Sequence, residues 1–319
     1  MEYLPLVMFT AGVSGSDPER WVALACRANT LDLVARAVEV PCLRPIILVT
    51  PLEGWADELS RLPVELMVDE PGDTFHFGRR LREVTARFGL RRFLYVGGGA
   101  GVLLSASDLE ALAGRALATQ SGVLTNNLYS TDLAAVAPAS ALETVDLPPT
   151  DNDLAWRLAA SGFPVQSLPA SAGTRFDLDA TTDLAIAGLH PACGPRLRRL
   201  VEGLPLASDG VRRVLAELHS PQGEVLAYGR VPSATWARLE RLPCQTRVFS
   251  EERGMRASGR LERGEVRAWL GTLLQQVGPR LFFRSLEDKC TAAVLDTRVL
   301  FAHLGLRPSA ADRYYSDLL

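Results

Sequence analysis

The stretch Phe93-Leu-Tyr-Val-Gly-Gly-Gly-Ala-Gly-Val-Leu-Leu-Ser-Ala-Ser-Asp-Leu-Glu-Ala-Leu112 carries the signals of a strand, a glycine turn and a helix, in that order. Phe93 to Val96 are four apolar residues typical of a buried strand. Three glycines follow, and Ser107 with Glu110 three residues later predicts the start of a helix. In α/β sheets a strand of this kind presents a ligand at its carboxyl end.

The segments before this stretch also alternate between predicted strands and predicted helices. Apolar runs at 4–9, 45–50 and 64–68 predict further buried strands. Apolar residues at helical spacing separate these runs, and we expect one of the helices to begin at Thr30. Residues 1–190 are therefore predicted to form a three-layer α/β domain around a mostly parallel sheet.

The pattern changes after the pair His190-Pro191. From there on, helical spacing dominates and the extended pieces are short, so we predict a mainly helical α+β domain at 191–319. The helices are expected near 194–202, 210–218, 233–241, 264–277 and 291–304, with extended pieces at 225–228, 246–249 and 281–284.

Composition restricts the classes of partner. The chain of 319 residues has a formal net charge of −3, which gives it no overall attraction to nucleic acid or to an anionic membrane. Lys289 is the only lysine, so arginine supplies nearly all positive charge. The five cysteines are widely spaced and form no Cys-x-x-Cys, and no apolar run is long enough to span a membrane. We expect a cytoplasmic protein with reduced thiols.

The last residues of the chain include an apolar group. We expect Tyr314, Tyr315 and Leu318 to pack either on the chain itself or on a partner subunit, so a homo-oligomer stays one of the alternatives.

The glycine turn does not fit the two common phosphate-binding patterns. A Gly-x-Gly-x-x-Gly reading from Gly97 or Gly99 fails because Val102 and Leu104 stand at its third position. A P-loop needs a Gly-Lys-Ser/Thr sequence, and the single lysine of the chain lies elsewhere. The Gly-x-Ser-x-Gly signature of hydrolases is absent as well.

A third pattern matches several segments in order. Phe9-Thr-Ala-Gly-Val-Ser-Gly15 follows the first predicted strand, and Thr125-Asn126-Asn127 follows a later one. Asp177-x-Asp179-x-x-x-Asp183-Leu184 precedes a predicted helix. Together with the stretch from Leu94 to Leu109, these segments resemble nucleotidyltransferases of the GT-A, or nucleotide-diphospho-sugar transferase, type. The resemblance is to the guanylyltransferases that act on molybdenum cofactor and on phospholactate, and it covers roughly residues 1–190.

This resemblance implies a function and a set of site residues. It implies a three-layer fold and a transferase that joins a nucleoside monophosphate, from a nucleoside triphosphate, to a small phosphorylated acceptor. Mg2+ would be the cofactor, held by Asp177 and Asp179. The implied nucleotide contacts are Ala11, Gly12 and Gly15 of the first loop, Gly98 and Gly99 of the glycine turn, and Asn126 and Asn127, which would touch the base or the acceptor.

The sequence departs from the family's pattern at two points. The metal-binding aspartate of the family's Asp-x-Pro turn aligns with Gly99, and the signature lysine has no counterpart, which leaves Arg20 or Arg27 as substitutes. An Asp-x-Asp before a helix can also serve as its cap, and Asn residues belong in ordinary turns. The alternative is therefore a non-catalytic relative that uses the same cleft to bind a ligand or a partner protein.

The predicted second domain contains one further candidate. Arg253, Arg256 and Arg260 alternate with Gly254 and Gly259, a composition that can hold a phosphate or a carboxylate. The alternative is a mobile, charged surface loop. Farther along the chain, one aspartate and one arginine interrupt an apolar run at 292–304, and an internal ion pair or a polar helix face explains them.

Overall fold

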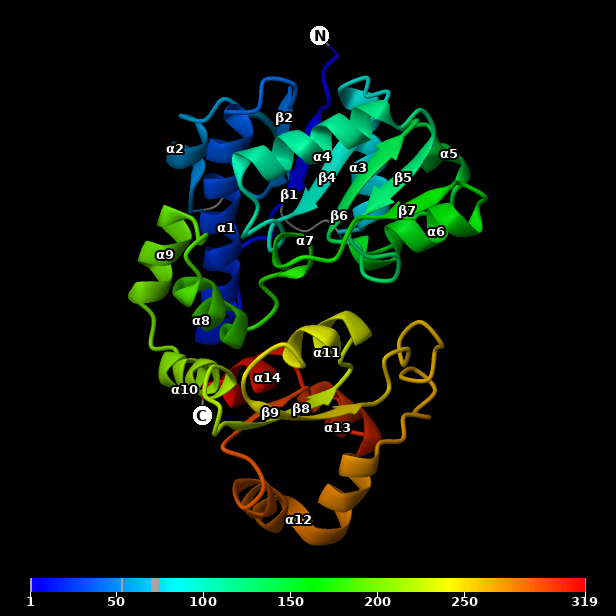
Figure 1. The fold of residues 1–319 in the computed structure, drawn as a ribbon. Coiled ribbons are helices and arrows are strands. Elements are labelled where there is room, and N and C mark those ends of the chain that lie inside the picture. Colours follow the sequence, from blue (N-terminus) through cyan, green and yellow to red (C-terminus); the bar gives the residue numbers. More distant parts are fainter. Residues whose placement is uncertain (1, 53, 70–74, 319) are drawn as a thin grey trace. The chain divides into compact units, whose positions relative to one another are not determined.

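The computed structural model describes residues 2–52, 54–69 and 75–318 (Figure 1). The chain divides into two compact units, Met1–Leu206 and Ala207–Leu319. In the described residues, no helix is long and apolar enough to cross a membrane.

A seven-stranded sheet forms the centre of the first unit. Its order is β3-β2-β1-β4-β6-β5-β7, and only β6 runs antiparallel to its neighbours β4 and β5. The strands are β1 (Leu6–Phe9), β2 (Ile46–Thr50), β3 (Glu65–Val68), β4 (Phe93–Gly97), β5 (Gly122–Thr125), β6 (Leu133–Ala137) and β7 (Val165–Ser167). Every residue of β1, β2 and β4 is buried, because helices cover both faces, as the continuous apolar runs predicted.

Two separate apolar clusters form the two faces of this sheet. Leu6 and Met8 of β1 belong to one cluster, while Val7 and Phe9 belong to the other, as strand alternation requires. The long helices α1 (Asp17–Val38) and α4 (Ala106–Ala118) contribute to the first cluster, and α3 (Phe77–Arg87), α5 (Ala141–Thr144) and α6 (Leu154–Ala160) to the second (Figure 1). The predicted three-layer, mostly parallel fold is confirmed. Its shorter helices are α2 (Ala56–Leu59), α7 (Ala172–Arg175), α8 (Thr181–Leu189), α9 (Pro195–Glu202) and the 3-10 turn η1 (Asp151–Asp153).

Two predicted helix starts were wrong. Helix α4 begins after Ser105, whose hydroxyl accepts from the Asp108 amide while the Asp108 carboxylate accepts from the Ser105 amide, so the cap lies two residues before Ser107. Helix α1 begins after Ser16 and passes through Thr30 without a break. The Thr30 hydroxyl instead donates to a carbonyl within the same helix, which removes its capping role.

The first unit extends beyond the boundary predicted from the sequence. Helix α9, which the sequence pattern placed in the second domain, packs on α1 and α8. The buried carboxylate of Asp32 in α1 accepts from the amides of Arg196 and Leu197 at 3.1 and 3.0 Å, and so caps the start of α9. Gly194 leaves room for this carboxylate, because a Cβ at that position would lie 2.2 Å from its Oδ2. The division between the units therefore falls after α9.

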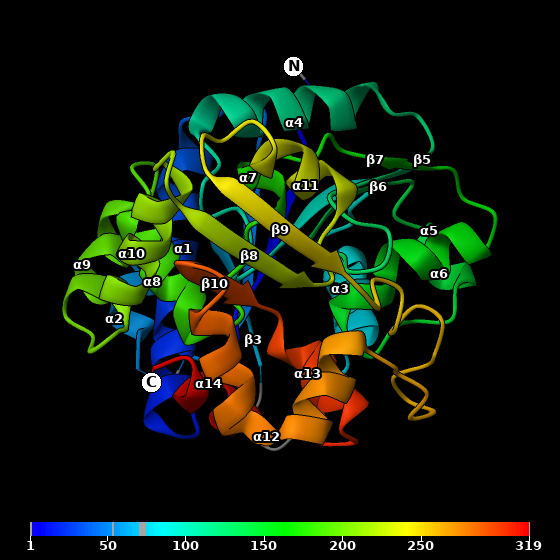
Figure 2. The ribbon, with the colours of Figure 1, turned by 60° about the horizontal axis from the view of Figure 1, so that its bottom comes forward.

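A small parallel sheet with the order β10-β8-β9 organises the second unit (Figure 2). Its strands are β8 (Glu224–Gly229), β9 (Gln245–Ser250) and β10 (Ala292–Leu295), and its helices are α10 (Ser208–Leu218), α11 (Ser233–Leu239), α12 (Trp269–Glu287), α13 (Thr297–His303) and α14 (Ala310–Ser316). The extended piece predicted at 281–284 was wrong, since α12 resumes after a kink where Gly278 adopts a φ of +76°. The helix predicted at 291–304 begins instead with β10, because this apolar segment pairs with β8.

Candidate active site

The glycine turn lies against the end of β1, at the carboxyl edge of the first sheet. The Gly97 amide donates to the Asp132 carbonyl at 2.9 Å, so the turn is also bonded to the start of the antiparallel strand β6. A Cβ at Gly98 would lie 3.0 Å from the Phe9 carbonyl oxygen and 3.1 Å from the hydroxyl of Thr10. The fold thus brings Gly98 next to the beginning of the first loop.

The buried side chain of Asn29, on helix α1, holds the glycine turn. Its Nδ2 donates to the carbonyls of Gly98 and Ala100, at 2.9 and 2.8 Å. From the other side, the Leu178 amide donates to the Gly99 carbonyl at 3.1 Å. The turn is therefore fixed between α1 and the segment that precedes α8, a role for Asn29 that no sequence motif indicated.

The space next to the Cα of Gly99 is filled by a neighbouring side chain. A Cβ built on it would lie 2.5 Å from Oδ1 of Asp177. The carboxylate of Asp177 thus fills the space into which a side chain at position 99 would extend. An acidic group is present beside the turn, although it comes from a different segment than the resemblance implied.

Four carboxylates gather around the turn. Burial, followed by the charges of the other three, raises the pKa of Asp177 to about 8. Burial also raises the pKa of Asp132 to about 6, against the opposing effects of an Asn126 hydrogen bond and the Arg175 charge. The pKa of Asp151 is raised by burial as well. The cluster consists of Asp132, Asp151, Asp177 and Asp179.

Asp151 is attached to the centre of the sheet by Tyr95. The buried Tyr95 hydroxyl donates to its Oδ2 at 2.7 Å. Burial and the Asp151 charge raise the pKa of Tyr95 well above its ordinary value, so the phenol keeps its proton and remains a donor. Neither residue was a sequence candidate, and the only signal was a hydroxyl-bearing residue within an otherwise nonpolar strand.

The segment before α8 divides its acidic residues between two roles. Asp183 caps the helix, because its Oδ2 accepts from the amides of Asp179 and Ala180 at 3.0 and 2.8 Å. The cap of this helix is therefore the third aspartate of the Asp-x-Asp-x-x-x-Asp segment. No group of three or more His, Cys, Asp or Glu side chains is arranged to hold a metal ion anywhere in the described part of the chain.

The first loop is shaped by its connection to α1. Gly15 has a φ of +89°, and a Cβ there would lie 2.5 Å from the Glu19 carboxylate. That carboxylate accepts from the amide and the hydroxyl of Ser16 at 2.8 and 2.7 Å. Ala11 is exposed, and Gly12 lies beside Pro51. The loop thus leads from the end of β1 into a firmly capped helix.

The arginines considered as substitutes for the family's lysine are engaged elsewhere. Arg20 pairs with Asp17, and both side chains are more than half exposed. Arg27 is buried, with its guanidinium carbon 4.8 Å from the ring centroid of Trp55. Arg175, at the end of α7, is instead a cation whose charge acts on the Asp132 carboxyl. It was not a sequence candidate.

The two asparagines after β5 shape their own loop. The Asn126 side chain is buried, accepts from the amides of Asp132 and Leu133 at 3.1 Å each, and donates to Oδ2 of Asp132 at 3.0 Å. The Asn127 Oδ1 accepts from the Tyr129 amide, as in an ordinary Asx turn. Asn126 therefore acts on the site through Asp132, which it orients.

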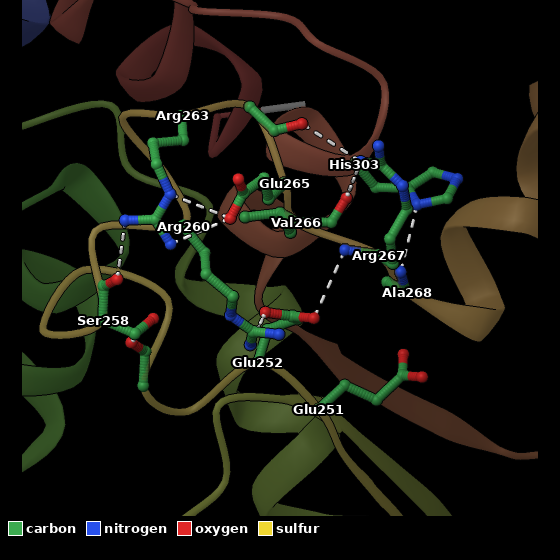
Figure 3. Close-up of polar contacts among 12 residues, drawn as sticks. Glu251, Glu252, Ser258, Arg260, Arg263, Glu265, Val266, Arg267, Ala268 and His303 are labelled. Carbon is green, nitrogen blue, oxygen red and sulfur yellow. Dashed lines mark hydrogen bonds and ion pairs between the residues drawn. The ribbon is translucent and has the colours of Figure 1, made fainter.

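The second unit uses several of its charged residues internally (Figure 3). Arg260 pairs with Glu252, a carboxylate only 6% exposed that also accepts from the Arg267 amide. Arg263 pairs with Glu265. These contacts hold the loop between β9 and α12 in place. Farther along, Asp296 pairs with Arg230, which precedes it by 66 residues, through two hydrogen bonds of 2.6 and 3.3 Å.

Comparison with known proteins gives similarities of fold. No family model and no curated protein matches the chain. One similar solved structure is a cytidylyltransferase from Leptospira borgpetersenii, with 14% identity, a TM-score of 0.44, and coverage of 63% of this chain and 93% of that one. Another is a putative nucleotide-diphospho-sugar transferase from Desulfovibrio desulfuricans, with 9% identity, a TM-score of 0.45, and coverage of 63% and 98%.

Proposed function

We propose that the first unit is a nucleotidyltransferase, which joins a nucleoside monophosphate from a nucleoside triphosphate to a small phosphorylated acceptor. The observation that carries the proposal is the carboxylate cluster beside the glycine turn, at the carboxyl edge of the sheet. This edge is where open α/β sheets bind ligands. Burial, and then the charges of its acidic neighbours, raise the pKa of Asp177, and perturbed pKa values of this kind cluster at functional sites.

The donor set fits Mg2+ that arrives together with the nucleotide. Mg2+ is commonly bound by one or two carboxylates, by substrate phosphates and by waters, rather than by a complete cage of protein ligands. Asp177 and Asp179 would hold it, and the raised pKa of Asp177 reflects its burial first and its acidic neighbours second. When bound, the ion would neutralise the negative charge that develops on the triphosphate.

The placement of the nucleotide follows from the turn and the first loop. Backbone amides of Ala11, Gly12 and Gly15, and the close approach allowed by Gly98 and Gly99, would receive the phosphates. Arg175 would supply the cation that the family's lysine provides elsewhere, since its charge already acts at the cluster. The Asn126–Asn127 loop would border the acceptor or the base.

The second candidate is a non-catalytic relative that binds a ligand or a partner protein at the same edge of the sheet. The engagement of Arg20 with Asp17 and of Arg27 with Trp55 favours it, because neither arginine supports a triphosphate at the cluster in the arrangement observed. The two candidates differ in whether bound nucleotide is converted.

Thermal unfolding with each of the four nucleoside triphosphates, with and without Mg2+, tests the proposal. We expect one triphosphate to raise the melting temperature in the presence of Mg2+ only, and Asp177→Asn or Asp179→Asn to abolish the increase. Asp153→Asn is the matched control, because Asp153 lies in the turn η1 and is not one of the four carboxylates of the cluster. No metal-dependent increase with any nucleotide would contradict the proposal. Release of pyrophosphate on addition of phosphorylated acceptors would then separate the transferase from the binding protein.

A further inference from the structure

A cavity lies at the opposite, amino-terminal edge of the first sheet. Its volume is about 650 Å3, within the range of small-molecule sites. It is bordered by the segment before β1, the loop before β2, the loop between α3 and β4, and the end of β6. The carboxylate cluster belongs to the other edge of the same strands, so the two sites are separate.

The cavity carries an excess of positive charge. Arg44, Arg91 and Arg92 line it, and Glu2 is its only acidic lining residue. The guanidinium groups of Arg44 and Arg91 are exposed and have no hydrogen-bond or ion-pair partner in the described residues. In a chain whose net charge is −3, such a group of unpaired cations favours an anionic ligand.

The side chain of Arg92, the third arginine of this cavity, is held in place by contacts within the chain. Its Nη1 donates to the Leu117 carbonyl at 2.8 Å, and its Nη2 lies 3.4 Å from the Glu2 carboxylate, which is 62% exposed. The guanidinium is therefore held in place before a ligand arrives, while its acidic partner can turn into solvent. Oxyanions bind well to arginine forks oriented in this way.

The remaining lining is largely apolar. Tyr3 is 54% exposed beside the cavity, and Phe88, Leu90 and several prolines complete the walls. An exposed aromatic ring next to unpaired arginines suits a ligand with both a flat apolar part and a charged group. An inorganic anion would contact the arginines but would leave the apolar walls of the cavity without a partner.

We propose that this cavity is a binding site for a small organic anion. Its phosphate or carboxylate group lies among Arg44, Arg91 and Arg92, and its flat apolar part lies against Tyr3 and Phe88. Nothing in the proposed transfer reaction uses this edge, so the site is independent of that reaction and suits an effector.

Titration calorimetry with phenyl phosphate, benzoate and inorganic phosphate tests the proposal. We expect phenyl phosphate to bind more tightly than inorganic phosphate, and the double variant R44A/R91A to weaken phenyl phosphate at least about tenfold. The matched control is R82A/R213A, which removes the same charge from two exposed arginines that also lack side-chain partners in the described chain. Benzoate distinguishes a general oxyanion site from one that prefers phosphate.

Three outcomes would overturn the proposal. Equal affinities for the two double variants would show non-specific attraction to surface charge. Equal binding of phenyl phosphate and inorganic phosphate would remove the apolar contribution, and so would a Tyr3→Ala variant that binds phenyl phosphate as the wild type does. Circular dichroism and melting temperatures of the variants establish that the exposed substitutions leave the fold intact.

Discussion

Replacing Asp177 with asparagine is expected to stabilise the protein at neutral and alkaline pH. The carboxyl lies beside Gly99 among three other carboxyls, and burial with these charges raises its pKa to about 8. Its ionised form is therefore unfavourable in the folded chain. Asparagine has nearly the same shape and carries no charge, so the substitution removes this unfavourable term.

The sign of the pH dependence follows from the two pKa values of Asp177. Its pKa is about 8 in the folded chain, against 3.8 for an unperturbed aspartate such as that of the unfolded chain. The folded state thus holds the proton more tightly, and the stabilising contribution is complete below pH ~4 and is lost as the pH rises towards 8. The full difference between the two pKa values corresponds to about 6 kcal/mol at about 1.4 kcal/mol per pKa unit. Because the neighbouring carboxyls titrate together with Asp177, we expect a net effect of roughly 2–5 kcal/mol.

Urea unfolding at several pH values, with EDTA present, measures this effect. Tryptophan fluorescence follows the unfolding, and Trp55, which is buried in the first unit, contributes to this signal. We expect Asp177→Asn to exceed the wild type in unfolding free energy by the largest amount near pH 8 to 9, and by little near pH 4. Asp153→Asn is the control, and it should follow the wild type throughout.

Parallel pH profiles of the wild type and Asp177→Asn would refute the reasoning. They would mean that the carboxyl is solvated or paired in the folded chain, and that its neighbours do not act on it. A loss of stability in Asp177→Asn at every pH would contradict it in another way, by showing that the ionised carboxylate makes hydrogen bonds that outweigh its burial.

Two glycine substitutions test the close packing at the cluster and at α9. Gly99→Asp is expected to lower the melting temperature instead of restoring a metal ligand, because its Cβ would lie 2.5 Å from Oδ1 of Asp177, and the double variant G99D/D177G should recover part of the loss. Gly194→Ala is expected to cost about 2 kcal/mol in urea unfolding, since its Cβ would lie 2.2 Å from the Asp32 carboxylate that caps α9. Gly114→Ala, in α4 with nothing within 4 Å, should be neutral or stabilising, so equal losses at positions 194 and 114 would contradict this account.

The layers of the first unit could be predicted from sequence because their signals are local. β1, β2 and β4 are short apolar runs buried on both faces, and the glycines after Phe93–Val96 mark the end of a strand. Helix starts were harder. Ser105 and Ser107 both have an acidic residue three positions later, so the sequence offers two capping boxes, and the packing of α4 selects the first.

The extent of the first unit could not be predicted, because a contact across 164 residues decides it. Nothing near Arg196 indicates that its amide is capped by a side chain from α1. A weak signal exists within α1 itself, where Asn29, Thr30 and Asp32 are all buried although polar. Polar residues so close together in a buried helix face indicate partners elsewhere in the chain.

The same limit applies to the site. Asp177 and Asp179 were predicted because their spacing forms a motif, whereas Asp151 and Tyr95 are 56 residues apart and form a pair only after folding. Asn126 was predicted as a ligand contact, but its amide has hydrogen bonds to its own loop. Residue type alone does not distinguish a side chain that binds a ligand from one that orients its neighbour.

The sequence and the structure lead to different conclusions from the glycine at position 99. In the sequence it marks a missing carboxylate and therefore counts against metal-dependent transfer. In the structure its lack of a side chain is what allows Asp177 to approach the turn, so an acidic group still stands there. Only the missing lysine then counts against catalysis. Arg175 is a cation whose charge reaches the cluster, and its position decides which proposed function holds. If Arg175→Ala binds nucleotide as the wild type does, the cluster has no cation for the triphosphate, and the non-catalytic relative is the better account.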